Sequence, residues 1–67
     1  MKYTFAKDPE GYAKKVMLKD GDQKLFVCWL YQEEIQEGES PSKAVDRQLK
    51  EAGYSSREDF WEHNFKE

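Results

Sequence analysis

Residues 12–31 decide the fold, and they read YAKKVMLKDGDQKLFVCWLY. Two apolar-rich runs, 12–19 and 24–31, flank the tetrapeptide Asp20–Gln23. An Asp-Gly pair between apolar runs is a strong hairpin signal, because glycine adopts the positive φ that a two-residue turn requires. We therefore predict a β-hairpin over residues 12–31 with Asp20-Gly21 as its loop.

That loop sets the register of the hairpin and the face that each side chain occupies. With Asp20-Gly21 as the loop, Val16 faces Leu25 and Tyr12 faces Trp29. Successive side chains of a strand point to opposite faces, so a slip of one residue would exchange the faces. The predicted core face holds Tyr12, Val16, Leu18, Leu25, Val27, Trp29 and Tyr31. The predicted second face is basic near the turn and apolar beyond it, and it holds Lys15, Met17, Lys19, Lys24, Phe26, Cys28 and Leu30.

Residues 24–37 also have a helical interpretation. Asp22 is a possible cap for a helix that runs to Glu37 and ends at Gly38. The β-branched and aromatic content of residues 25–31 favours a strand instead. We expect a strand to about Tyr31, followed by a helical turn or a loop. Residues 2–6 alternate polar and apolar side chains and favour a third short strand.

Two helices are predicted after the hairpin. Ser40-Pro41 is typical of a helix start and Gly53 of a helix end, because serine caps, proline suits the first position and glycine suits the last. A second helix starts at Ser55 or Ser56, and Ser55 with Glu58 fits a capping box. The fold class is therefore α+β: a small antiparallel sheet packed against two C-terminal helices, in a single domain over residues 1–67. The expected buried positions of the helices are Ala44, Val45, Leu49, Ala52, Phe60, Trp61 and Phe65.

Composition and cysteine content indicate a cytoplasmic protein. Charged residues make up 37% of the chain and hydrophobic residues also 37%, with 15% aromatic. Cys28 is the only cysteine, whereas small secreted domains usually carry several in disulfides. The N-terminal residues lack the apolar run of a signal peptide, and the longest apolar run, 25–31, is far shorter than a membrane span. We expect no membrane association.

Residues that carry catalysis or bind metals are scarce. Cys28 lies in the most apolar stretch, where burial would raise its pKa and keep the thiol unreactive. His63 is the only histidine and lies four residues after Asp59. One cysteine and one histidine do not make a zinc site, and no calcium-loop pattern is present. We expect no enzymatic activity, no cofactor and no metal.

Charge divides the chain into two halves. Residues 1–31 hold six lysines and four acidic residues, a net +2, whereas residues 32–67 hold five basic and ten acidic residues, a net −5. The acidic half offers a candidate interaction surface at Glu33, Glu34, Glu37, Glu58, Asp59 and Glu62. The hairpin offers a second candidate on its second face, at Lys15, Met17, Lys19, Lys24, Phe26 and Leu30.

These features favour a small non-catalytic protein-interaction module, a regulator or inhibitor whose partner is a larger protein or a second copy of the chain. In a sharper version the acidic half imitates nucleic-acid phosphate, in the manner of small phage proteins. The alternative is a domain that binds single-stranded nucleic acid on the basic hairpin face. That alternative is less favoured, because the face has one aromatic residue, Phe26, no arginine occurs in residues 1–46, and a helix could cover it.

Overall fold

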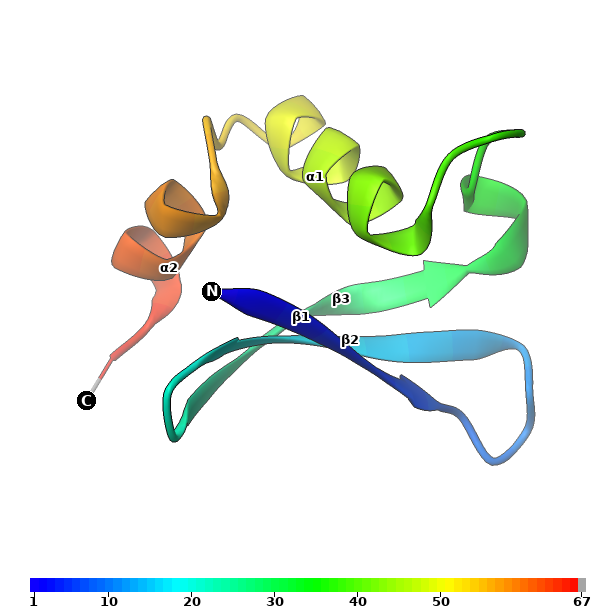
Figure 1. Ribbon diagram of the computed structural model, residues 1–67, viewed down its shortest axis with the longest axis horizontal. Coiled ribbons are helices and arrows are strands. Elements are labelled where there is room, and N and C mark those ends of the chain that lie inside the picture. Colours follow the sequence, from blue (N-terminus) through cyan, green and yellow to red (C-terminus); the bar gives the residue numbers. More distant parts are fainter. Residues whose placement is uncertain (67) are drawn as a thin grey trace.

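Three strands are followed by two α-helices in the computed structural model, which describes residues 1–66 (Figure 1). The strands form one antiparallel sheet with β2 in the centre. The α+β class is confirmed, and residues 23–31 are strand rather than helix. The elements are β1 (Lys2–Lys7), β2 (Ala13–Asp20), β3 (Gln23–Tyr31), the short 3₁₀ helix η1 (Gln32–Glu34), α1 (Pro41–Glu51) and α2 (Arg57–Asn64).

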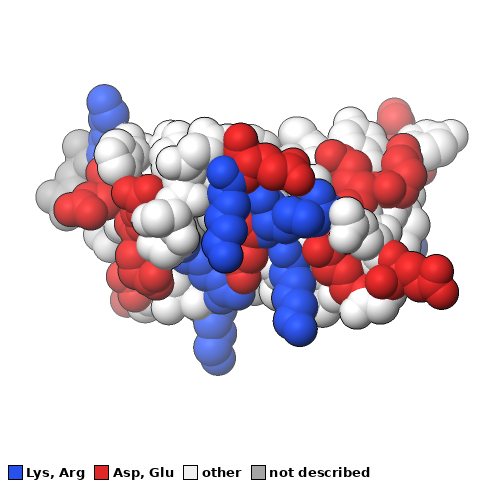
Figure 2. Space-filling model, turned by 90° about the horizontal axis from the view of Figure 1, so that it is seen from above, with Lys and Arg blue, Asp and Glu red and all other residues white. Residues whose placement is uncertain are grey.

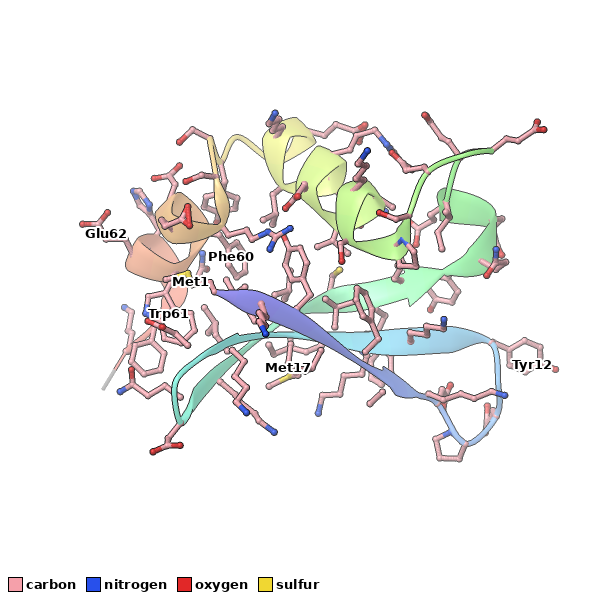
Figure 3. The ribbon with its side chains drawn as sticks, viewed as in Figure 1. Met1, Tyr12, Met17, Phe60, Trp61 and Glu62 are labelled. Atoms are coloured by element: carbon pink, nitrogen blue, oxygen red, sulfur yellow. The ribbon has the colours of Figure 1, made fainter. Side chains whose placement is uncertain are left out.

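Both α-helices lie on the same face of the sheet, and the other face is left uncovered (Figure 1). The side chains between the layers exclude water and supply most of the stabilisation, as expected for a two-layer domain. Phe60 of α2 points into this space (Figure 3). The buried core consists of Val16, Leu18 and Leu30 from the sheet and Ala44, Val45, Leu49 and Phe60 from the helices.

The hairpin loop is Gly21-Asp22 rather than the predicted Asp20-Gly21. Asp20 pairs with Gln23, so the strands extend one residue further on that side. Gly21 adopts a φ of +61° while Asp22 does not have positive φ, as in hairpin turns that place glycine first. The pairing is displaced by two residues, an even number, so side chains near the turn keep their predicted faces.

A β-bulge in the middle of β3 is a second difference from the predicted register. Val16 pairs with Cys28 whereas Met17 pairs with Phe26, which leaves Val27 as an extra residue. An extra residue reverses the alternation of side chains beyond it. In β3 the predicted faces are therefore right on the turn side of Val27 and wrong on the other side, whereas β2, which has no extra residue, keeps its predicted faces.

The bulge exchanges the far end of β3 between the two faces. Leu30, predicted on the second face, points into the core and is 2% exposed. Cys28, also predicted there, packs against the core. Trp29 and Tyr31, predicted in the core, are exposed. Tyr12, another predicted core residue, precedes β2 and is also exposed.

The end signals of α1 are confirmed. The Ser40 hydroxyl accepts a hydrogen bond from the Lys43 N–H, with Pro41 in the first helical turn. At the other end the Gly53 N–H donates to the Lys50 carbonyl and the Tyr54 N–H to the Leu49 carbonyl. These two bonds form a Schellman motif, which requires the positive φ of +100° that Gly53 adopts.

The start of α2 lies at the second of the two predicted serines. The Ser56 hydroxyl accepts from the Asp59 N–H, and the Asp59 carboxylate accepts from the Ser55 N–H. The predicted capping box of Ser55 with Glu58 is therefore wrong by one residue. Ser56 is the cap, and Asp59 rather than Glu58 accepts the backbone N–H before it.

A polar cluster on the covered side ties three elements together. Asp46 of α1 accepts two hydrogen bonds from the Arg57 guanidinium at the start of α2, at 2.9 and 3.0 Å, and a third from the Tyr3 hydroxyl of β1. The guanidinium carbon lies 4.2 Å from the centre of the Tyr3 ring, a cation–π distance. The hydrogen bonds from Arg57 are the main cause of a lowered pKa for Asp46.

Candidate functional site

The uncovered side of the sheet, which we call the outer face, is organised in cross-strand rows. Partners in an antiparallel ladder point to the same side, so the observed pairing assigns each row to a face. Met17 lies on the side away from the helices (Figure 3), which identifies its partners as outer-face residues. The rows are Lys2, Lys19 and Lys24 at one end, then Thr4, Met17 and Phe26, then Ala6, Lys15 and Trp29, and last Ala13 and Tyr31.

Three aromatic side chains are exposed on this face. Phe26, Trp29 and Tyr31 are 43%, 46% and 43% exposed. The rings of Phe26 and Trp29 lie 6.2 Å apart between centroids and are inclined by 60°. The Lys15 ammonium nitrogen lies 6.0 Å from the centre of the Phe26 ring. Large exposed aromatic groups that adjoin one another are unusual on a solvated surface and are typical of binding surfaces.

The outer face also carries four lysines, and no outward position of the strands carries a carboxylate. Within residues 1–66 none of these lysines lies within 4.0 Å of a carboxylate oxygen. Lys2, Lys19 and Lys24 stand directly opposite one another, an arrangement of like charges that destabilises a sheet. The end row therefore has uncompensated positive charge that an anion would neutralise.

Five of the six residues predicted for the second face lie together on the outer face. Leu30 is the exception, because the bulge turns it inward. The sequence reasoning missed Trp29 and Tyr31 for the same reason. It also missed Lys2. The alternation of polar and apolar side chains in residues 2–6 indicated its face, but only the pairing of β1 with β2 places Lys2 beside Lys19.

The predicted acidic surface is two separate clusters rather than one. Figure 2, which looks onto the helix layer, shows acidic side chains at both ends and lysine and arginine between them. One cluster lies in and after η1 and the other on α2. The first holds Glu33, Glu34 and Glu37, and the second holds Glu58, Asp59 and Glu62.

Two of these six carboxylates have structural partners. Glu34 accepts the Tyr31 N–H at 3.0 Å and the Gln48 side-chain amide at 3.1 Å, which fixes the end of β3 against α1. Asp59 accepts the Ser55 N–H at 2.9 Å. Glu33, Glu37, Glu58 and Glu62 are exposed.

Cys28 and His63 lie on different elements and are not hydrogen-bonded to one another. Cys28 is half-buried on β3, with its Sγ 3.9 Å from the Gln48 side-chain oxygen, and burial raises the pKa of its thiol. His63 is exposed on α2, with its Nδ1 2.8 Å from the Asp59 carbonyl oxygen, and this hydrogen bond is the main cause of its raised pKa.

Among residues 1–66 no three or more His, Cys, Asp or Glu side chains gather as a metal site would require. None of the helices described has the length and apolar character needed to cross a membrane. Comparisons of the chain with family models, with curated proteins and with solved structures found no match. The surfaces of the molecule are therefore the basis for assigning a function.

Proposed function

We propose that this chain is a small non-catalytic binding module that holds single-stranded nucleic acid on its outer face. The observation that carries the proposal is the meeting of exposed aromatic rings and uncompensated lysines on the one sheet face that no helix covers. Two reasons for disfavouring this function from the sequence no longer hold. The helices lie on the opposite face, and the aromatic residues number three rather than one.

The aromatic rings favour a single strand as the ligand. Every base has a flat π face, so bases stack on exposed aromatic side chains without a requirement for one sequence. In a duplex those faces are occupied by neighbouring bases, whereas an unpaired strand presents them. Phe26 and Trp29 offer adjoining surfaces, and Tyr31 offers a third.

The lysines favour a phosphate backbone. Lys15 lies within the aromatic group, and the row of Lys2, Lys19 and Lys24 lies beyond it at the hairpin turn. A strand that stacks on Trp29 and Phe26 and runs along β3 would bring its next phosphates to that row. Phosphates would relieve the like-charge repulsion among the three lysines, so binding and stability would be coupled.

The protein-interaction module predicted from the sequence, whose partner is another protein or a second copy, remains a prediction. The version in which acidic residues imitate phosphate has less support, because its six residues form two clusters with cations between them and two of the six have internal partners. An acidic protein would meet the lysines of the outer face equally well, but it would not need three adjoining stacking surfaces.

Fluorescence anisotropy with a labelled oligothymidine of about ten nucleotides tests the proposal. We expect binding at low salt that weakens as salt rises, with a log–log slope of at most about −3 if each of the four lysines neutralises one phosphate of a single strand. Lys24→Glu should weaken binding and reduce the slope. Trp29→Ala should weaken binding by about 1–3 kcal/mol while leaving the slope nearly unchanged, because stacking does not release counterions.

Lys43→Glu is the matched control, since Lys43 is an exposed lysine on α1 in the helix layer. Its affinity should stay near that of the wild type. Absence of binding at low salt, or an equal loss for Lys43→Glu and Lys24→Glu, contradicts the proposal. A dimer in light scattering that Trp29→Ala dissociates would indicate that a second copy occupies the face instead.

A further inference from the structure

The outer face ends in a hollow beside the turn that joins β1 to β2. The hollow has a volume of about 390 Å³. Three exposed aromatic side chains and two carboxylates surround it. Its lining residues are Asp8, Glu10, Tyr12, Ala13, Trp29 and Tyr31. We propose that this hollow holds one unstacked base of the bound strand and prefers guanine, an inference that rests on the proposed function and adds base preference to it.

The size and lining of the hollow suit a planar aromatic ligand. Tyr12 is 74% exposed and stands apart from the sheet at this end (Figure 3). Trp29 and Tyr31 border the hollow from β3, while the buried Ala13 from β2 is small and leaves room between them. Single-strand readers hold splayed bases in this way, with π faces against aromatic side chains and polar groups at the base edge.

The lysines of the outer face favour a base over a free cation. Asp8 and Glu10 alone would suit an ammonium or guanidinium group surrounded by aromatic rings. However, Trp29, which lines the hollow, has Lys15 as its cross-strand partner, so an ammonium group belongs to the row that borders the hollow. A base that is attached to phosphate can use both the carboxylates and this lysine, whereas a free cation is repelled by the lysine.

The carboxylates of Asp8 and Glu10 differ in their hydrogen bonds to the protein. Asp8 Oδ1 accepts the Glu10 N–H at 3.3 Å, and the Asp8 carbonyl accepts the Gly11 N–H at 2.8 Å, so Asp8 holds the turn. Glu10 is exposed, and within residues 1–66 its carboxylate has no hydrogen bond or ion pair. Glu10 is therefore the residue available to read a ligand.

A carboxylate selects guanine among the bases because of its donor pattern. Its two oxygens accept two parallel hydrogen bonds, which is the geometry that makes such contacts strong. Guanine presents its N1–H and its exocyclic N2–H₂ side by side on one edge. Adenine, cytosine and thymine do not present two adjacent donors on that edge. Glu10 thus gains a second hydrogen bond only with guanine.

Tryptophan fluorescence tests this inference. Trp61→Phe removes the second tryptophan, so that Trp29 alone reports on the hollow. The probes are oligothymidines of about ten nucleotides in which one terminal residue is thymidine, guanosine, adenosine or cytidine, at either end. We expect guanosine at one of the two ends, but not at the other, to make binding about tenfold tighter than the other three residues do. This magnitude is typical of a two-bond contact to a base.

Glu10→Gln should abolish the guanine preference, measured as the ratio between the affinities for terminal guanosine and terminal thymidine, because glutamine replaces one acceptor by a donor. It should not weaken the binding of plain oligothymidine, since it removes a negative charge beside the bound strand. Glu62→Gln, an exposed glutamate of α2, is the matched control and should keep the preference. Equal affinity for all four oligomers overturns the inference while the proposed function stands. Failure of every oligomer to bind overturns both. Tight binding of an oligoarginine peptide that depends on Glu10 overturns the inference in favour of a cation site.

Discussion

The bulge in β3 makes a prediction about two neighbouring residues, Leu30 and Trp29. Without the bulge the register predicted from Asp20-Gly21 would bury Trp29 and expose Leu30. With it, Leu30 is 2% exposed and Trp29 is 46% exposed. Leu30→Ala should therefore destabilise the fold more than Trp29→Ala, although tryptophan is the larger side chain.

The expected magnitudes follow from burial. A leucine buried to this extent costs about 2–5 kcal/mol when it is truncated to alanine, because a cavity remains in the core. Truncation of the half-exposed Trp29 costs about 1–2 kcal/mol, since half of its surface is in water already and no closed cavity forms. A domain of 67 residues has a total stability of about 3–10 kcal/mol, so Leu30→Ala removes a large share of it.

Urea unfolding followed by far-ultraviolet circular dichroism measures both variants, because this signal arises mainly from the peptide backbone. At about 1 kcal/mol per molar urea, Leu30→Ala should lower the midpoint by about 2 M or more, and Trp29→Ala by about half as much or less. Trp29→Ala should also lose affinity for oligothymidine. A larger loss of stability for Trp29→Ala than for Leu30→Ala would refute the register and, with it, the outer face described above.

Two further predictions concern the helix layer. The hydrogen bonds from Arg57 lower the pKa of Asp46 below its ordinary value of 3.8, so their contribution to stability is present above about pH 4 and is lost as the pH falls through the lowered pKa. Asp46→Asn should be less stable than the wild type at neutral pH and should lose less stability on acidification. Urea unfolding at several pH values measures this, and an equal loss of unfolding free energy on acidification in the two proteins would contradict it. Gly53→Ala should lower stability by about 1–2 kcal/mol, because alanine is strained at the φ of +100° that Gly53 adopts, and an unchanged melting temperature would count against the Schellman motif.

The helices were predictable because their ends depend on local chemistry. Ser40-Pro41 and Gly53 act through the backbone within a few residues, so the sequence contains the whole signal. The start of α2 was predicted to within one residue for the same reason. The choice between Ser55 and Ser56 depended on which acidic side chain reached back, and this could not be read from the spacing.

The faces of β3 were not predictable beyond Val27. Residues 25–31 are apolar at every position, so alternation cannot distinguish an inward from an outward side chain. The bulge places Cys28 and Leu30 against the core cluster and turns Trp29 outward, and this preference arises from packing between distant segments. Lys15, Lys19 and Lys24 were identified from the sequence because β2 and the turn side of β3 keep the predicted alternation. Lys2 was missed because the pairing of β1 was not predicted, and Trp29 and Tyr31 were missed because they follow the bulge.

The separation of charge between the layers reconciles nucleic-acid binding with a chain whose net charge is −3. The excess negative charge lies in residues 32–67, mostly on the helix side, whereas the outward strand positions carry lysine and no carboxylate. A polyanion is attracted to the lysine-bearing face and repelled by the acidic one. Both electrostatic interactions act over about one Debye length, roughly 10 Å at 0.1 M salt. On the proposed function the acidic half therefore directs a strand to the outer face and opposes a second, non-specific mode on the helices.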